Sequence, residues 1–194
     1  MITAIIAQGT KGEMGFQGKL PWKDYKLELE TFYDTLAKIS PTIIIIGAST
    51  YKSLPKTVID RIRRAPNLRT KEGKEIVADL HVVGLSAIQE AGIEKGIIDF
   101  TPILNVGKNF KDFYPDEFRA VCIGGASLLD KLMRVEAIKD VYISTVFPLH
   151  PKTTLEADVF VPKSLSEVDA TKVLIGQVIN ENELFGHSQE YWYL

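Results

Sequence analysis

The segment from Gly18 to Phe32, GKLPWKDYKLELETF, holds acidic side chains that helix geometry can tell apart. At about 100° per residue, one apolar arc is formed by Tyr25, Leu29, Phe32 and Leu36. Glu28 lies at the edge of this arc, whereas Glu30 points well away from its centre and Asp24 suits an N-cap. Glu28 is therefore the acid that the pattern directs toward an apolar cleft, where burial would suit it to proton transfer. The alternative is a solvated or lysine-paired Glu28.

Two strand–glycine–helix junctions form a second candidate site. They are IIIIG-AST at 43–50 and VCIGG-ASLL at 121–129. Each opens a helix N-terminus, with unpaired N–H groups, at the carboxyl end of a strand, and two of them could hold a dinucleotide pyrophosphate. Neither has the G-x-G-x-x-G or Walker spacing. Ordinary chain reversal is the alternative.

The elements that would position these residues alternate between strand and helix. Apolar strand-like runs are TAIIAQ, TIIIIG, LHVVGLS, AVCIGG and DVYISTVF, and helical stretches are 24–39, STYKSL, SAIQEA and ASLLDKLMR. This alternation predicts an α/β fold with a mainly parallel mixed central sheet of about eight strands, flanked by helices. KVLIGQVINEN and EYWYL have no helix between them, which predicts an antiparallel C-terminal strand. We expect Asp24 to cap the first helix and Ser49 or Thr50 to cap STYKSL.

Length and composition limit the kinds of protein that this chain can be. The 194 residues predict a single domain over 1–194, and 45% hydrophobic with 25% charged residues is typical of a soluble globular protein. The lone Cys122 lies in an apolar run, which favours a reducing, cytoplasmic setting. MITAIIAQG does not resemble a secretory signal, and no apolar run is long enough to span a membrane. The net charge of −2 argues against nucleic-acid binding, and the scattered histidines suggest no metal.

Between Arg61 and Lys74 the chain becomes basic and loses periodicity, RIRRAPNLRTKEGK. We interpret this stretch as a solvated loop or hairpin within a surface insertion around 62–80. Residues 92–118 are poorly patterned.

Seven segments match, in order, those of one enzyme family. They are MITAIIA, MGFQGKLPW, the W-x5-(D/E)-x3-F spacing of Trp22, Glu28 and Phe32, IIIIGASTYKSLP, VCIGGASLL, DVYIST with ADVFVP, and HSQEYWYL. On these segments the chain resembles the dihydrofolate reductase family. The resemblance implies that fold and the NADPH-dependent reduction of 7,8-dihydrofolate to 5,6,7,8-tetrahydrofolate, with hydride added at pterin C6 and a proton at N5. This reaction belongs to one-carbon metabolism.

The resemblance also implies the residues that act on the substrate. Glu28 would be the buried acid, Ser144 its hydroxyl partner and Trp22 the residue that fixes a water beside it. Arg61 would grip the glutamate α-carboxylate of dihydrofolate, with Arg63 or Arg64 as substitutes if the register shifts. The implied substrate site is completed by Ile5, Ala7, Leu29, Phe32, Leu54 and Ile123. Antifolates such as methotrexate would bind there.

For the cofactor, the resemblance implies a binding surface that runs from the flexible loop to the glycine turns. Its members are Ala7, Met14, Gly15, Leu20, Gly47, Ala48, Ser49, Thr50, Leu85, Ser86, Ile123, Gly124, Gly125, Ala126, Ser127 and Leu128. Gly124-Gly125 would carry a cis peptide, and Asp158 would brace the flexible loop.

The chain departs from the family where members often carry Lys or Arg against the 2′-phosphate of NADPH. It has Ala48, Ser49 and Ser127 at those positions, and Ser86 matches a remaining hydroxyl contact. Our hypothesis is that the basic insertion supplies the missing charge through Arg63, Arg64 and Arg69. Two other functions stay open: a reductase of the same fold that acts on another heterocycle, such as the riboflavin-pathway pyrimidine, and a non-catalytic structural relative.

Overall fold

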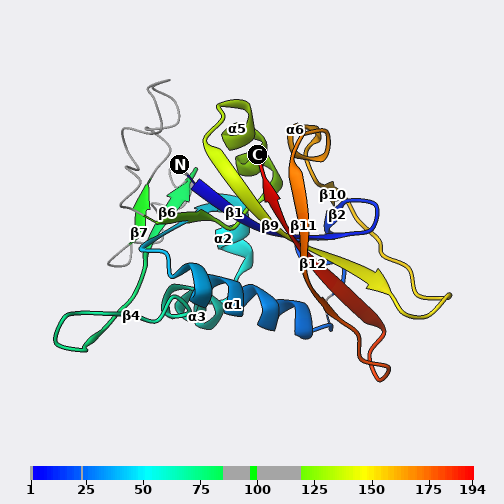
Figure 1. Cartoon of the computed structure of the whole chain (residues 1–194), viewed down its shortest axis with the longest axis horizontal. Coiled ribbons are helices and arrows are strands. Elements are labelled where there is room, and N and C mark those ends of the chain that lie inside the picture. The colour runs from blue at the N-terminus through cyan, green and yellow to red at the C-terminus, as the bar shows by residue number, and fades with distance from the viewer. Residues whose placement is uncertain (1, 23, 85–96, 100–118) are drawn as a thin grey trace.

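The computed structural model describes residues 2–22, 24–84, 97–99 and 119–194. Its centre is an eight-stranded sheet in the order β11-β12-β9-β1-β8-β3-β6-β7 (Figure 1). The pairs from β9 through β1, β8, β3 and β6 to β7 are parallel. β12 runs antiparallel to both β9 and β11. The prediction of a mainly parallel mixed sheet with an antiparallel C-terminal strand is therefore confirmed.

The main-sheet strands are β1 (Ile2–Gly9), β3 (Ile43–Gly47), β6 (Asp79–Val83), β7 (Ile97–Asp99), β8 (Ala120–Cys122), β9 (Ile138–Pro148), β11 (Thr171–Val178) and β12 (Phe185–Tyr193). Two small sheets pair β2 (Glu13–Gly15) with β10 (Val159–Phe160), and β4 (Leu68–Arg69) with β5 (Glu75–Ile76). The helices are α1 (Leu27–Ile39), α2 (Ala48–Ser53), α3 (Lys56–Arg64), α5 (Ala126–Arg134) and α6 (Lys163–Ser166).

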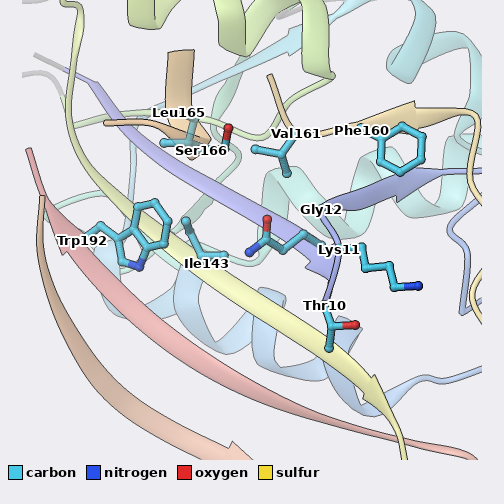
Figure 2. Close-up of a pocket in the computed structure, with 10 residues that line it drawn as sticks. Thr10, Lys11, Gly12, Ile143, Phe160, Val161, Leu165, Ser166 and Trp192 are labelled. Carbon is cyan, nitrogen blue, oxygen red and sulfur yellow. The ribbon is translucent and has the colours of Figure 1, made fainter. Parts of the chain in front are cut away.

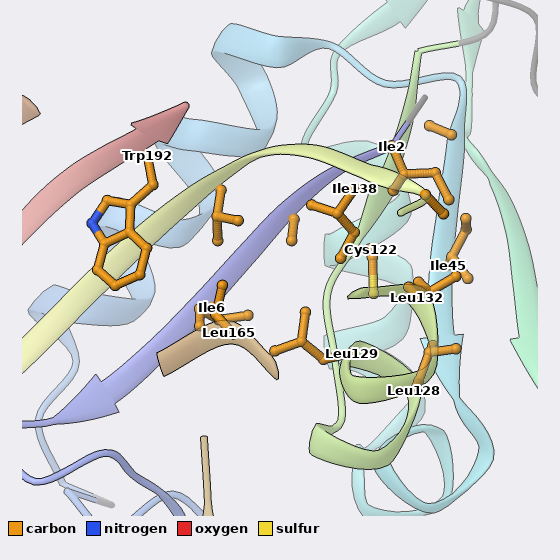
Figure 3. Close-up of a cluster of buried hydrophobic side chains, with 14 of the residues drawn as sticks. Ile2, Ile6, Ile45, Cys122, Leu128, Leu129, Leu132, Ile138, Leu165 and Trp192 are labelled. Carbon is orange, nitrogen blue, oxygen red and sulfur yellow. The ribbon is translucent and has the colours of Figure 1, made fainter. Parts of the chain in front are cut away.

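Strand β3 shows why this sequence forms a central strand. Its four consecutive isoleucines are β-branched, and each is at most 9% exposed. Ile44 and Ile46 pack with Leu36 of α1, whereas Ile43 and Ile45 pack with the leucines of α5 on the other side. Figure 3 shows this second cluster around Cys122 and α5. The sheet thus separates two cores, and both faces of β3 are buried.

The start of α1 differs from the sequence prediction. The N-cap is Lys26 with no side-chain cap, and Asp24 is exposed instead of capping the helix. A turn fixes this entry, because the Tyr25 N–H donates to the Trp22 carbonyl at 2.8 Å and Tyr25 is only 4% exposed. Burial of the two aromatic rings therefore sets where the helix begins.

The predicted cap of the next helix was also wrong. The N-cap of α2 is Gly47, again with no side-chain cap, and both Ser49 and Thr50 lie inside the first helical turn. Gly47 is the last residue of β3, so the chain enters α2 before either hydroxyl can reach a capping position.

The basic stretch after Arg61 forms the hairpin that was one of its two predicted structures, but it begins in a helix. It contains the last turn of α3 and then the β4–β5 hairpin. Arg63 is 8% exposed and its Nε donates to the Ala78 carbonyl at 2.9 Å, so this arginine is buried and not solvated. The single domain over 1–194 and the insertion around 62–80 stay predictions.

Two further stretches complete the comparison with the sequence. Strand β7 lies within the stretch 92–118, where the sequence pattern predicted no element. The helix expected at SAIQEA lies outside the described residues. Among the described residues, no helix is long and apolar enough to cross a membrane.

Candidate active site

Glu28 lies in the first turn of α1 and is 4% exposed, although it is an acid. Burial disfavours the charged carboxylate and raises the pKa of Glu28 to about 7, while a hydrogen bond from the Ser144 hydroxyl partly offsets that rise. A carboxyl group with this pKa can hold and release a proton near neutral pH. The structure therefore excludes the alternative of a solvated Glu28.

Strand register brings Ser144 to Glu28. Ser144 lies on β9 opposite Ala7 of β1 and opposite Gln189 of β12, and it is 2% exposed. Successive side chains of a strand point to opposite faces, so Ser144 and Val146 face α1 while Ile143 faces the other core. The predicted acid and its hydroxyl partner thus meet where α1 crosses these two parallel strands.

Trp22 supplies a second polar atom beside the acid. The residue is 1% exposed and packs with Tyr25, Val146 and Ala7. Its indole N–H lies close enough to lower the pKa of Glu28, but it makes no direct hydrogen bond with any described residue. A buried indole N–H nearly always has a hydrogen-bond partner. The donor therefore suits a polar atom placed between Trp22 and Glu28.

Apolar side chains expected at the substrate site come together next to Glu28. Ile5 belongs to the core cluster on the α1 face and is 3% exposed. The partly buried residues packed against this cluster include Leu29, Phe32, Leu54 and Ile123. Ala7 lies one position along the same face of β1 and packs against the Trp22 cluster. These residues come from β1, from α1 and from the segments that directly follow α2 and β8.

Of the three arginines considered for the glutamate carboxylate, Arg61 is the one that lies against α1. Its guanidinium carbon is 3.9 Å from the ring centroid of Tyr33, and its Nη2 is 3.8 Å from Glu30 Oε1. Arg63 is buried, and Arg64 forms a 2.8 Å ion pair with Glu75. Arg61 therefore keeps an exposed guanidinium beside the apolar wall.

The two glycine turns are neighbours, as the sequence pattern requires for a shared pyrophosphate. The Gly47 N–H donates to the Gly124 carbonyl at 2.8 Å, and Gly124-Gly125 is a cis peptide, as the resemblance implied. A Cβ added at Gly125 would come within 2.7 Å of Thr50 Oγ1, so this close approach requires glycine. The N-caps of α2 and α5 are Gly47 and Gly125, neither with a side-chain cap.

The side chains around these turns differ in exposure. Ser49 and Ser127 are exposed, Ala48, Thr50 and Ala126 are partly exposed, and Leu128 is buried. Leu85 and Ser86, also expected to contact the cofactor, lie outside the described residues.

The segment expected to close over the nicotinamide is tied to β10. Gly15 of β2 pairs with Val159, and the Gly15 carbonyl accepts a hydrogen bond from the Asp158 N–H at 2.9 Å. The carboxylate of Asp158 accepts another from the Gln17 N–H at 2.9 Å. Asp158 thus makes the bracing contacts that the resemblance implied. Met14 is partly buried and Leu20 is 42% exposed.

The hypothesis that the basic insertion contacts the 2′-phosphate is wrong. The glycine turns lie at the carboxyl ends of β3 and β8, whereas the Ala78 N–H just before β6 donates to the Arg63 carbonyl. β3 and β6 are parallel and in register, so the insertion is at the amino end of the sheet. A five-residue strand spans about 16 Å. Arg69 donates within its own hairpin, to the Gly73 carbonyl.

A cavity of about 280 Å³ lies away from this site (Figure 2). It is lined by Gln8, Ile143, Leu165, Trp192 and the segment 10–12, among others. Ile143 points to the face of β9 opposite Ser144, so the cavity is on the α5 side of the sheet. Among the described residues, no group of His, Cys, Asp or Glu side chains could hold a metal ion.

The sequence interpretation missed a polar cluster behind Glu28. His187 of β12, treated as one of three scattered histidines, is 1% exposed and bonds to both Tyr25 and Thr31. Gln189, two residues further along β12, bonds to Thr35. The period-two spacing of His187 and Gln189 was the one signal in the sequence, because their partners are more than 150 positions away.

The fold and the site define an α/β protein that places a buried acid between an apolar wall and two adjoining glycine turns. No family model matches the chain. The chain is 35% identical over 159 residues to the dihydrofolate reductase of Escherichia phage T5, covering 81% of this chain and 78% of that protein. It is 26% identical over 152 residues to dihydrofolate reductase type A10 of Escherichia coli, covering 78% and 66%.

A solved structure with a similar fold is dihydrofolate reductase from Enterococcus faecalis complexed with NADP(H) and RAB-propyl. It matches with a TM-score of 0.59 and 21% identity over 100% of this chain and 95% of that one. At this identity the structural match supports the fold, and the phage relative carries the assignment. The chain belongs to the dihydrofolate reductase family.

Proposed function

We propose that this chain catalyses the reduction of 7,8-dihydrofolate to 5,6,7,8-tetrahydrofolate, with NADPH as the reductant. The observation that carries the proposal is Glu28, a buried acid with a pKa raised to about 7, held by Ser144 and faced by the unpaired indole N–H of Trp22. A partly reduced pteridine presents an amino group and a ring N–H to such a carboxylate. Family membership supports the same reaction.

Glu28 would both orient the pterin and handle its proton. Its carboxylate accepts hydrogen bonds from the pterin amino group and ring N–H, which fixes the ring against Ile5 and Phe32. The Trp22 N–H is a donor for a water or a substrate atom beside the acid, which suits proton delivery toward N5. Ser144 holds the carboxyl group in this orientation. The catalytic residues in this proposal are Glu28, Trp22 and Ser144.

The remaining groups of the substrate match the rest of the site. The apolar wall of Leu29, Leu54 and Ile123 suits the aminobenzoyl ring. Arg61, whose exposed side chain stacks on Tyr33 of α1, suits the α-carboxylate of the glutamate. Antifolates with a diaminopteridine ring, such as methotrexate, would use the same contacts with Glu28.

The cofactor site fits a dinucleotide. The uncapped N–H groups that follow Gly47 and Gly125 are donors for the pyrophosphate, and glycine at both positions lets the backbone approach it closely. NADPH, when bound, supplies the hydride that reduces pterin C6. Ala7, Met14, Gly15 and Leu20 would border its nicotinamide and exclude water.

The test is to follow the absorbance of reduced nicotinamide with dihydrofolate present, with NADPH and NADH in parallel. We expect consumption of NADPH that depends on dihydrofolate and is abolished by methotrexate. Dihydrofolate-dependent activity that methotrexate does not affect would favour a reductase of another heterocycle. No spectral change with either cofactor would favour a non-catalytic relative. A cytoplasmic location is also part of the proposal, because Cys122 is a free, buried thiol, as is usual in a reducing compartment.

A further inference from the structure

A buried imidazole joins both sides of the helix turn that carries Glu28. His187 Nδ1 lies 2.7 Å from the Tyr25 hydroxyl, and Nε2 lies 2.8 Å from Thr31 Oγ1. Tyr25 is three residues before Glu28 and Thr31 is three residues after it. His187 is 1% exposed, so water does not compete for these contacts. One side chain of β12 is thus bonded to the chain on either side of the acid.

The direction of these hydrogen bonds follows from their geometry. Thr31 Oγ1 lies 3.3 Å from the Leu27 carbonyl, to which its hydroxyl donates. Thr31 has one hydroxyl proton, so it must accept from an Nε2–H of His187, and Nδ1 must accept from the Tyr25 hydroxyl. The neutral Nε2–H tautomer satisfies all three contacts. Burial supports this state, because it lowers the pKa of His187 and raises the pKa of Tyr25 to about 12.

The chain of hydrogen bonds ends on the peptide group that precedes Glu28. The Leu27 carbonyl belongs to the peptide bond between Leu27 and Glu28, so the bond from Thr31 fixes the plane from which the Glu28 side chain extends. The start of α1 has no side-chain cap that could do this instead. His187 therefore replaces a cap as the group that sets the first turn.

A second contact of the same kind lies one helical turn further on. Gln189 Nε2 donates to Thr35 Oγ1 at 2.9 Å, and Thr35 donates to the Thr31 carbonyl at 2.8 Å. Gln189 pairs with Ser144 on β9, whose hydroxyl bonds to Glu28. The contacts of His187 and Gln189 thus align α1 with the strand that carries the partner of the acid.

We propose that His187 is a positioning residue for the reduction: through Tyr25, Thr31 and the Leu27 carbonyl it holds the first turn of α1 so that Glu28 faces Ser144 and the pterin. The inference rests on the proposed function. It differs from a purely structural role in one measurable way. Loosening the network should weaken the binding of ligands that bond to Glu28. It should not change the binding of the cofactor, which in the proposed function contacts the glycine turns.

The experiment compares His187→Gln and Thr31→Val with the wild-type chain. Glutamine keeps an amide near the Nε2 position and loses the contact with Tyr25, whereas valine matches the shape of threonine without its hydroxyl. For each variant we expect the Kd of methotrexate to rise and kcat to fall by about tenfold, the scale of one lost buried hydrogen bond. The Kd of NADPH should stay within about twofold of the wild-type value. Thr31→Ser keeps the hydroxyl and should therefore show values close to those of the wild type.

Ser188→Ala is the matched control, because Ser188 lies between His187 and Gln189 on β12 and points to the other face of the sheet. We expect Ser188→Ala to leave the Kd of methotrexate and the Kd of NADPH unchanged. Thermal unfolding of every variant shows whether it is folded at the assay temperature. The inference is overturned if Thr31→Val and His187→Gln bind methotrexate as the wild type does, or if they lose NADPH and methotrexate to the same extent. If the wild-type chain binds no methotrexate and turns over no dihydrofolate, the proposed function fails instead.

Discussion

The two faces of strand β9 bury their side chains equally but differ in chemistry. Along β9, Ile143 and Ser144 are adjacent and are 1% and 2% exposed. Ile143 belongs to the apolar core under α5, whereas Ser144 faces α1, where Glu28 and His187 are also buried. On the α5 side, Cys122 is a neutral thiol, because burial raises its pKa to about 12.

This difference indicates what each face is for. A buried polar group is destabilising unless it is hydrogen-bonded, so a face chosen only for stability would be apolar. The α1 face instead keeps a protonatable acid, and its polar neighbours His187 and Gln189 are bonded to α1. At β9 the α5 face therefore contributes stability, whereas the α1 face carries the groups to which we assign the proposed chemistry.

The largest expected effect is on the polar face. Glu28→Gln should lower turnover of dihydrofolate by about 10²–10⁴-fold at neutral pH, the usual scale for a lost general acid. The loss should shrink at low pH, where the substrate can arrive already protonated. The measurement is the pH dependence of kcat and kcat/KM in steady-state assays.

Glu30→Gln is the control for that substitution. Glu30 is the next acid along the helix, but it is exposed and lies 3.8 Å from Arg61. The Glu30→Gln variant should keep most of the activity toward dihydrofolate. Equal losses in the two variants would show that Glu28 is not the catalytic acid.

On the apolar face the expected effect is on stability and not on activity. Leu132 of α5 is 0% exposed, and truncating it in Leu132→Ala should lower the free energy of unfolding by about 2–5 kcal/mol. Activity per folded molecule should stay near the wild-type value, because the α1 face is untouched. Denaturant unfolding and active-site titration measure the two quantities. Leu174→Ala on β11, where the side chain is 64% exposed, should change neither.

The sequence predicted the elements whose pattern is local. Four consecutive isoleucines bounded by Pro41 and Gly47 indicate a buried strand without any knowledge of the neighbouring strands. Helix periodicity selected Glu28 over Glu30 for the same reason, since the apolar arc of one helix shows which side faces the core. The glycine turns were visible as strand–glycine–helix junctions.

What the sequence could not predict depends on contacts between distant residues. The start of α1 is set by burial of Trp22 and Tyr25, so Asp24 looked like a cap that the fold does not use. The position of the basic hairpin at the amino end of the sheet follows from the pairing of β3 with β6. His187 finds Tyr25 and Thr31 only after β12 has paired with β9, and nothing in its local sequence shows this.

The polar face should also make stability depend on pH. The pKa of Glu28 is raised from 4.5 to about 7, so the folded protein binds this proton more tightly than the unfolded chain does. The stability from this group is complete below about pH 4.5 and is lost as the pH rises through 7. Glu28→Gln removes that dependence. The free energy of unfolding of Glu28→Gln minus that of the wild type should therefore rise by up to about 3 kcal/mol from pH 4.5 to pH 8.

Denaturant titrations across this range check the prediction. Glu30→Gln serves again as the control and should follow the wild-type pH dependence. A wild-type chain whose stability does not fall between pH 4.5 and 8 relative to Glu28→Gln would show that the carboxyl group is solvated.

The smallest expected effect is at Arg61, which is exposed beside α1. Arg61 stacks on Tyr33 and its side chain is 56% exposed, so water screens its attraction for a carboxylate. Arg61→Gln should raise the KM for dihydrofolate by about tenfold, the lower end of the range for a charge-assisted hydrogen bond. A dihydropteroate substrate without the glutamate should be reduced equally well by both proteins. Arg64→Gln removes an arginine that is paired with Glu75, and it should leave the KM for both substrates unchanged. A KM that rises equally for both substrates would mean that Arg61 supports the wall of the site and does not contact the glutamate.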